Sequence, residues 1–213
     1  MNDVFVTPDG FRFLPGRIAR PDQVRLIEAV IAGQRDAPFW QPTMPRTGQP
    51  LSVTMTNFGS LGWVTDKEKG YRYEPVHPLT GKAWPSMPDF LIGLWRELAN
   101  YPADPEACLV NWYGASSRMG MHVDRDEEAN DAAVISISLG DKARFRIGGP
   151  ARGGKTASMV VSSGDVVVLG GAARRCYHSV DRIYPGTSTL LPSTAFPGGG
   201  RINLTMRRVG RPV

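Results

Sequence analysis

The chain has 213 residues, 41% of them hydrophobic, and no apolar run near the ~20 residues of a membrane-spanning helix, which favours one globular domain without a membrane span. Two cysteines, Cys108 and Cys176, are too few for a disulfide framework, and residues 1–5 lack the features of a secretory signal, so we expect a cytoplasmic protein. The formal net charge of +5 is compatible with a polyanionic partner, although many globular proteins are equally basic.

The first half of the chain predicts two helices separated by a stretch rich in proline and glycine. Residues 21–31 read as an amphipathic helix with proline in its first turn. Its expected apolar face consists of Val24, Ile27 and Ile31. A second helix is expected to begin near Ser86, which forms a capping-box-like start with Asp89. The stretch between the helices contains four aromatic residues that we expect to be exposed, Trp63, Tyr71, Tyr73 and Trp84.

The second half of the chain changes to the period of β-strands. Apolar and polar residues alternate over 134–139, 144–147 and 201–207, and residues 159–169 read as strand, turn and strand. Helices followed by many short strands predict an α+β chain whose core is a β-sandwich or barrel.

Two histidines and one aspartate form a candidate metal site. Residues i and i+2 of a strand point the same way, so His122 and Asp124 can aim at one point, and His178 follows a predicted strand. The remaining histidine, His77, lies in a turn-like context far from any partner. Two histidines and one carboxylate are the ligands of non-haem Fe(II) oxygenases. An H-x-D pair is also frequent by chance, so a structural role for these histidines stays open at this point.

The segment 201–207 carries a second polar pattern. Arg201, Asn203, Thr205 and Arg207 share one face of the predicted strand, whose other face is apolar. This face is either the solvated side of an edge strand or a surface that binds carboxylates, because guanidinium groups grip carboxylates in a bidentate manner. A dicarboxylate site beside an Fe(II) site implies 2-oxoglutarate.

One motif points elsewhere. Residues 149–156 match the P-loop pattern G-x-x-x-x-G-K-[ST]. A P-loop must open a helix whose N-terminus holds phosphate, yet residues 157–164 read as a strand. We interpret the match as accidental, in a loop that connects two strands.

A further indication of function comes from nine short stretches, which occur along the chain in this order: MTNFGSLGW, WPSMPDF, NWYG, HVDRDE, ISISLG, FRIGG, GDVVVLGG, YHSV and RINLTMR. From about Leu51 to Arg207 the chain resembles the bacterial AlkB-type Fe(II)/2-oxoglutarate-dependent nucleic-acid dealkylases. The resemblance implies an α+β fold with a double-stranded β-helix (jelly-roll) core, N-terminal helices and a substrate-binding lid over Thr54–Tyr73. It also implies a single domain, 1–213, with an N-terminal extension and nucleotide-recognition lid over about 1–105 and a catalytic core over about 106–213.

The resemblance assigns a role to individual residues. Fe(II) would be held by His122, Asp124 and His178. The 2-oxoglutarate pocket would be formed by Asn111, Tyr113, Arg201, Asn203, Thr205 and Arg207. Arg201 would pair with the distal carboxylate, and Arg207 would lie near the metal-bound end. The substrate would be contacted by Trp63, Tyr71, Asp126 and Arg152.

Within this set, Trp63 would stack on the damaged base, Asp126 would contact the base edge, and Tyr71 and Arg152 would contact the nucleic-acid backbone. Each has an ordinary alternative. Trp63 could be a core residue and Tyr71 a surface-packing one, Asp126 belongs to an acidic run that could be a solvated turn, and the loop of Arg152 could be mobile.

The activity implied is oxidative demethylation of N-alkylated bases such as 1-methyladenine and 3-methylcytosine in single-stranded DNA, with RNA as a further substrate. A monomer would couple O2 and 2-oxoglutarate to the release of succinate, CO2 and formaldehyde. A cationic lesion suits both an aromatic face and a carboxylate. Two alternatives stay open: an oxygenase of the same fold acting on a protein or small molecule, and a non-catalytic nucleic-acid-binding module or P-loop hydrolase. Leu169 stands where close relatives often have an aromatic residue, which leaves the range of lesions open.

Overall fold

The computed structural model describes residues 7–212, and its centre is a pair of facing β-sheets. The strands of the six-stranded sheet, in spatial order, are β1 (Phe11–Leu14), β10 (Val166–Leu169), β7 (Val134–Gly140), β12 (Arg201–Arg207), β5 (Ala107–Tyr113) and β2 (Thr54–Gly59). Those of the four-stranded sheet are β6 (Met119–His122), β11 (His178–Tyr184), β8 (Lys142–Ile147) and β9 (Ala157–Val161). A separate hairpin consists of β3 (Gly62–Asp66) and β4 (Gly70–Glu74). All pairings are antiparallel, and the predicted α+β jelly-roll fold is confirmed.

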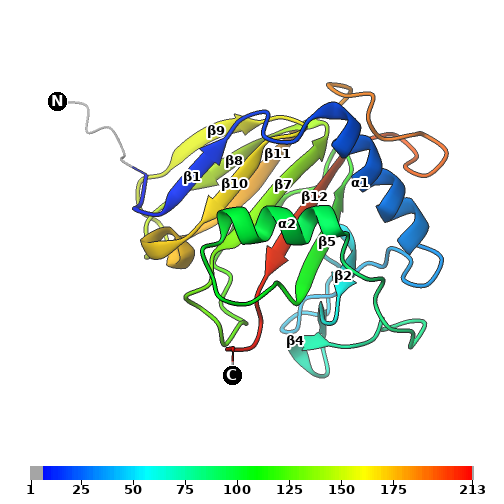
Figure 1. The fold of residues 1–213 in the computed structure, drawn as a ribbon, viewed down its shortest axis with the longest axis horizontal. Helices are drawn as coiled ribbons and strands as arrows, with labels where there is room; N and C mark the ends of the chain where they lie inside the picture. The colour runs from blue at the N-terminus through cyan, green and yellow to red at the C-terminus, as the bar shows by residue number, and fades with distance from the viewer. Residues whose placement is uncertain (1–6, 213) are drawn as a thin grey trace.

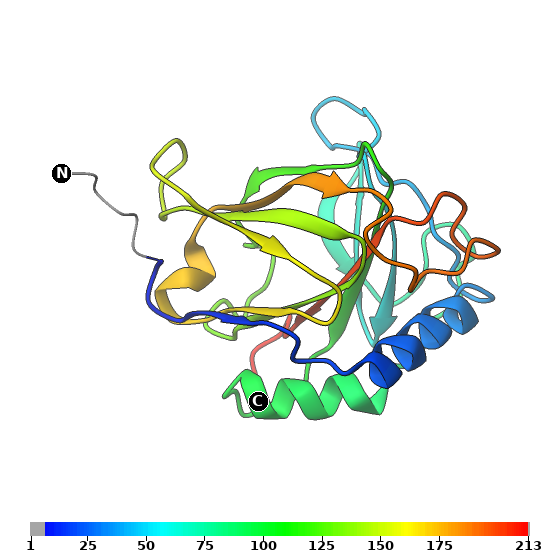
Figure 2. The ribbon, with the colours of Figure 1, turned by 90° about the horizontal axis from the view of Figure 1, so that it is seen from above.

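Two α-helices cover the outer face of the six-stranded sheet. They are α1 (Arg20–Gly33) and α2 (Asp89–Leu98), and a short 3-10 helix, η1 (Gly171–Arg175), precedes β11. Figures 1 and 2 show both α-helices on the side of this sheet that faces away from the four-stranded sheet. Within residues 7–212, neither helix is long and apolar enough to cross a membrane.

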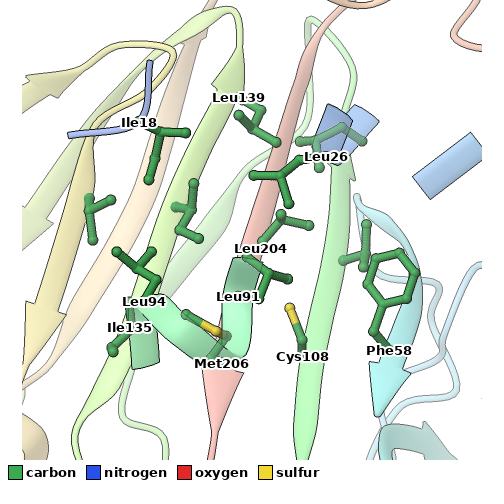
Figure 3. Packing of buried hydrophobic residues seen from close by; sticks show 14 of the residues in the cluster. Ile18, Leu26, Phe58, Leu91, Leu94, Cys108, Ile135, Leu139, Leu204 and Met206 are labelled. Carbon is green, nitrogen blue, oxygen red and sulfur yellow. The ribbon is translucent and has the colours of Figure 1, made fainter. Parts of the chain in front are cut away.

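The six-stranded sheet separates two apolar layers. Between this sheet and the helices, Leu91 and Leu94 of α2 pack with Leu204 and Met206 of β12, as Figure 3 shows. A second cluster, which includes Phe145 and Val167, fills part of the space between the two sheets. The even-numbered residues of β12 therefore face the helices, and its odd-numbered residues face the interior of the sandwich.

The position of β12 decides between the two interpretations of its polar face. The strand lies between β7 and β5, and all seven of its residues are buried. It is therefore not a solvated edge strand, and the side chains of Arg201 and Arg207 are buried charges that need partners.

Two helix predictions require correction. The buried face of α1 consists of Gln23, Leu26, Ile27 and Val30, whereas Val24 is 39% exposed. Gln23 takes a core position because its amide donates to Ile18 O at 2.8 Å and accepts from Ser163 Oγ at 2.8 Å. A polar residue bonded in this way is invisible to a search for apolar periodicity.

The start of α2 is also later than predicted. Its first residue is Asp89, its N-cap is Pro88, and no side chain caps it. Ser86 is therefore not the cap. The residue before a proline is disfavoured in the helical conformation, which keeps Met87 out of the helix.

The aromatic stretch is more buried than predicted, because Trp84 is only 5% exposed. Its ring packs against Trp40 and His77, with centroid distances of 5.6 and 5.2 Å. His77 is fully buried, donates from Nε2 to Pro38 O at 2.9 Å, and so has the partners that the sequence did not indicate.

The P-loop-like motif forms a loop between two strands. Residues 149–156 connect β8 to β9, two paired strands, and no helix follows, so the interpretation as a connecting loop is confirmed.

The expected substrate-binding lid consists of two different parts. Of residues 54–73, the first part is β2, a strand of the six-stranded sheet. The hairpin β3–β4 alone stands apart from the two sheets.

Candidate metal and co-substrate site

Strand register brings the three candidate metal ligands together. His122 ends β6 and His178 begins β11, and the two are direct partners across the strand pair, with ring centroids 4.4 Å apart. Asp124 follows two residues after His122, and its carboxylate lies 3.7 Å from Nε2 of each histidine. One ligand atom from each of the three residues lies within 4.8 Å of the others, which is compact enough to hold one metal ion.

The histidine side chains are oriented by backbone carbonyls. Nδ1 of His122 lies 2.8 Å from Gly120 O, and Nδ1 of His178 lies 3.2 Å from Cys176 O. A proton on each Nδ1 leaves the lone pair of Nε2 free for a metal, an arrangement common around metal-binding histidines. Burial, together with the charge of His122, lowers the pKa of His178 to about 4, which keeps this ring neutral at pH 7.

The carboxylate of Asp124 is held by an arginine of the central strand. Arg207 donates from Nη2 to Asp124 Oδ1 at 2.7 Å, and both side chains are buried. Burial would raise the pKa of Asp124, but the charges of Arg207 and the two histidines outweigh it and lower that pKa well below its usual range. The carboxylate is therefore ionised, as a metal ligand must be.

Arg201 offers buried donors that suit an anion. Its side chain is 1% exposed, and Nη2 donates to Ser138 Oγ at 3.0 Å. Nε and Nη1 have no partner within residues 7–212, and neither does the buried Oδ1 of Asn111. Burial lowers the pKa of Arg201, and unpaired buried donors are costly. A carboxylate bound to this guanidinium would satisfy them, so the residues fit 2-oxoglutarate.

The remaining polar residues of the central strand support the wall of the site. Asn203 Nδ2 donates to Ser136 Oγ at 2.7 Å and to Ile137 O at 2.9 Å, and its Oδ1 accepts from Thr205 Oγ1 at 2.8 Å. These bonds fix the two side chains before any ligand is present.

One cavity of about 600 Å³ gathers nearly all predicted site residues. The predicted residues that line it are Trp63, Tyr71, Asn111, Tyr113, His122, Asp124, Asp126, Arg152, His178, Asn203, Thr205 and Arg207. Arg201 does not line it, and its guanidinium lies over the ring of Tyr113, which does line it, 5.2 Å from the ring centroid. Arg46 and Arg125 also line the cavity, although no sequence pattern selects them.

The predicted substrate residues lie around the hairpin and the loop after β6. The rings of Trp63 and Tyr71 are stacked, 5.5 Å apart and 22° from parallel. Trp63 donates from Nε1 to Asp126 Oδ2 at 2.8 Å. Asp126 is therefore tied to the hairpin and is not merely part of a solvated turn. Arg152 donates to Met121 O at 3.2 Å and lies over the ring of Tyr177.

Sequence reasoning missed a buried layer beneath this site. Glu127, which reads as part of an acidic turn, has a fully buried side chain that pairs with Arg174 at 2.8 Å and Arg207 at 2.9 Å. The hydroxyl of Tyr73, on β4, joins the same group. No local pattern marks these residues, since Tyr73, Glu127 and Arg174 lie far apart in the sequence.

A jelly roll with a His-Asp-His cluster, beside a buried arginine that keeps two donors without partners, defines the class of Fe(II)- and 2-oxoglutarate-dependent oxygenases. The model of the 2OG-Fe(II) oxygenase superfamily matches residues 10–207. The chain is 51% identical over 201 residues to an alpha-ketoglutarate-dependent dioxygenase AlkB homolog of Caulobacter vibrioides, covering 93% of this chain and 87% of the relative. The AlkB dioxygenase of Escherichia coli is 38% identical, over 82% of this chain and 79% of the relative. The chain belongs to the 2OG-Fe(II) oxygenase superfamily and, within it, to the AlkB family.

A solved structure agrees with this assignment. The structure of OsALKBH1 superposes with a TM-score of 0.76 at 30% identity and covers 96% of this chain and 99% of its own. Membership of the family makes the protein an enzyme that uses Fe(II) and 2-oxoglutarate.

Proposed function

We propose that the protein removes alkyl groups from N-alkylated bases in DNA, of the 1-methyladenine and 3-methylcytosine type, with RNA as a further substrate. The observation that carries the proposal is the bond from Trp63 to Asp126 at the cavity that holds the His-Asp-His cluster. Relatives named as a DNA N(6)-methyladenine demethylase in Arabidopsis thaliana and a tRNA demethylase in Schizosaccharomyces pombe favour a nucleic-acid substrate.

The residues beneath the cavity hold the reacting groups in this proposal. His122, Asp124 and His178 hold Fe(II), which supplies the activation of O2 when 2-oxoglutarate is bound beside it. Arg201 binds the distal carboxylate of 2-oxoglutarate through its two unpaired donors, with Asn111 and Tyr113 next to it.

Further along the central strand, Arg207 keeps Asp124 ionised and oriented. Asn203 and Thr205, fixed by their own hydrogen bonds, form a rigid wall for the co-substrate. Rigid polar groups of this kind orient a ligand without reorganising when it binds.

The residues around the hairpin recognise the lesion. A base must leave the stack before its alkyl group can reach a buried metal site. Trp63 offers an aromatic face, and the carboxylate of Asp126 next to it attracts a cationic lesion. Basic Arg46, Arg125 and Arg152 line the same cavity and hold the phosphates of a single strand, with Tyr71 as a further backbone contact.

The overall reaction consumes O2 and 2-oxoglutarate and releases succinate and CO2, while the N-methyl carbon is oxidised to N-hydroxymethyl. The bond between this carbon and the ring nitrogen then breaks, which yields formaldehyde and the unmodified base. The residues of the cavity hold the base so that its methyl carbon faces the metal ligands.

The division of the chain, its assembly state and its location belong to the same proposal. Residues of about 1–105 supply the N-terminal extension and the recognition hairpin, and they also add β1 and β2 to the six-stranded sheet. Residues of about 106–213 form the rest of the catalytic core. The enzyme acts as a monomer, and it acts in the cytoplasm on single-stranded substrates. Sedimentation of the purified chain tests the monomeric state directly.

A substrate panel tests the proposed function. The purified protein is incubated with Fe(II), 2-oxoglutarate and single- or double-stranded oligonucleotides that contain 1-methyladenine or 3-methylcytosine, and the products are separated by mass. We expect unmodified bases, with faster turnover of the single strands. Binding of 2-oxoglutarate without loss of any methyl group would favour a protein or small molecule as the substrate instead.

A further inference from the structure

A buried network of four charged side chains lies beneath the candidate metal site. Arg207 donates from Nη2 to Asp124 Oδ1 at 2.7 Å and from Nη1 to Glu127 Oε1 at 2.9 Å. Arg174 donates from Nη2 to Glu127 Oε2 at 2.8 Å. The exposed fractions of these four side chains lie between 0 and 8%, so each charge depends on the others.

The charges of this network balance. Two carboxylates face two guanidinium groups, and removing one partner of such a buried pair leaves an uncompensated charge. Burial alone would raise the pKa of Glu127, but the charges of Arg207 and Arg174 and the hydrogen bond from Tyr73 together outweigh it and lower that pKa. Glu127 is therefore ionised and accepts hydrogen bonds on both of its oxygens.

Arg174 fixes the backbone near the metal site as well as the carboxylate of Glu127. It donates from Nη1 to Asp124 O at 2.6 Å and from Nε to Ala132 O at 2.9 Å. Arg207 thus holds the carboxylate of Asp124 while Arg174 holds its backbone. Neither arginine leaves Asp124 free to turn away from the two histidines.

Tyr73 connects the hairpin to this network. Its hydroxyl donates to Glu127 Oε1 and accepts from Arg207 Nη1 at 3.1 Å. On the hairpin, Tyr73 is the direct cross-strand partner of Trp63. A second attachment holds the hairpin to β2, since the backbone N of Trp63 donates to Asn57 Oδ1 at 3.2 Å. The side chain of Trp63 is a third attachment, because its Nε1 donates to Asp126 Oδ2 at 2.8 Å. Of these three, the Tyr73 hydroxyl is the one that enters the buried network of charges.

We propose that Tyr73, Glu127 and Arg174 are positioning residues that lock hairpin β3–β4 to Asp124, so that the ring of Trp63 and the candidate metal ligands keep a fixed separation. The inference rests on the proposed function, because it assigns the hairpin to lesion binding. The methyl carbon of the base must lie next to the metal when O2 is activated. If the hairpin moves, 2-oxoglutarate is converted to succinate while the methyl group stays unoxidised.

The variant that isolates this connection is Tyr73→Phe, which removes one hydroxyl and keeps the ring. We expect the ratio of succinate formed to base demethylated to rise. We also expect amide hydrogen exchange in residues 62–74 of the metal-free protein to become roughly 10-fold faster, because a lost hydrogen bond of ~1.4 kcal/mol has an effect of this size. The matched control is Tyr101→Phe, which loses a hydroxyl contact to Asp131 away from the cavity.

The second variant tests the arginine under Asp124. Arg174→Gln should weaken binding of Co(II), used as a spectroscopic stand-in for Fe(II), by roughly 10- to 100-fold, as is usual when a partner of a metal ligand is lost. Arg175→Gln, next to it on η1 and exposed, should bind Co(II) like the wild type. If Arg174→Gln does not fold, Glu127→Gln, which keeps the shape of the side chain, replaces it.

The outcomes separate this inference from the proposed function. Faster exchange in residues 62–74 of Tyr73→Phe, with weaker Co(II) binding by Arg174→Gln, supports the inference even if the wild type leaves every alkylated oligonucleotide unchanged. An unchanged product ratio together with unchanged hydrogen exchange in Tyr73→Phe overturns it, whatever the substrate.

Discussion

Arg207 and Asp124 form a buried ion pair in which Nη2 of the arginine lies 2.7 Å from Oδ1 of the aspartate. The other oxygen of the carboxylate, Oδ2, lies 3.7 Å from Nε2 of His178. Oδ1 thus accepts a hydrogen bond from Arg207. Oδ2, which faces His178, is the oxygen that we expect to bind a metal.

Replacement of this arginine should weaken metal binding. Arg207→Gln removes the charge that keeps Asp124 ionised and oriented, so we expect a loss of roughly 10- to 100-fold in Co(II) affinity, measured by titration of the absorption spectrum. Arg25→Gln, on the exposed face of α1, should bind Co(II) like the wild type. Equal affinities for the two variants would contradict an active role of the ion pair.

Replacement of Arg201 should affect the co-substrate and not the metal. Arg201→Gln leaves a bound carboxylate without its buried cation, which typically costs about 2 kcal/mol or more, a loss of roughly 30-fold in affinity. Calorimetric titration of 2-oxoglutarate into the Co(II) protein measures it. If the variant loses Co(II) binding instead, Arg201 supports the metal site and the assignment to 2-oxoglutarate fails.

The charge of Asp126 should govern discrimination between lesions. In Asp126→Asn the amide oxygen can still accept the bond from Trp63, so the change isolates the negative charge. Hydrogen bonds to charged groups exceed neutral ones by ~1 kcal/mol, so kcat/KM for cationic 1-methyladenine should fall roughly 5-fold. Turnover of a neutral alkylated base should change little. An equal fall for both substrates would point to a misplaced Trp63.

The metal-free protein should lose stability as the pH falls below neutrality. The pKa of His178 is about 4 in the folded protein and 6.5 in a free side chain. Between pH 4 and pH 6.5 the side chain is therefore protonated in the unfolded chain and neutral in the folded one. The neutral His178 contributes about 3 kcal/mol to the free energy of unfolding. This contribution is complete above pH 6.5 and is lost as the pH falls to 4. Burial lowers the pKa of His77 too, which adds in the same direction.

Thermal unfolding measured from pH 8 to pH 4 tests this expectation. His178→Asn removes one titrating group, so its Tm should fall less steeply with pH than that of the wild type. Saturating Co(II) should make the wild-type profile steeper, since metal and protons compete for the same imidazole. A variant whose Tm follows the wild-type profile would contradict the low pKa of His178.

How far the sequence predicts the site depends on how local each signal is. The polar face of β12 follows from a period of two over Arg201–Arg207, and the shared direction of His122 and Asp124 follows from their spacing. The role of His178 follows only from the resemblance, and its pairing with His122 is a result of the fold. The first two signals are local, because both lie within short segments of the chain. The chemistry of the site is therefore largely predictable from the amino-acid sequence.

The buried support of the site is not predictable in this way. Glu127 belongs to an acidic run, yet the fold carries it inward to two arginines from distant segments. Gln23 is polar and takes a core position, and Trp84 lies among turn residues but packs under the hairpin, where a Cβ on Gly62 would approach its ring to 2.3 Å. Such placements depend on tertiary partners that sequence periodicity cannot report.

The oxidation of a base methyl group at the expense of 2-oxoglutarate is tested most directly by following all products in one reaction. The wild type is mixed with Fe(II), O2, 2-oxoglutarate and a single-stranded oligonucleotide that contains 1-methyladenine, and succinate, formaldehyde and adenine are quantified together. We expect formaldehyde and adenine in equal amounts, succinate at no less than that amount, and none of the three in Asp124→Ala. Adenine released without 2-oxoglutarate, or succinate formed with no formaldehyde from any alkylated oligonucleotide, would contradict the proposed reaction.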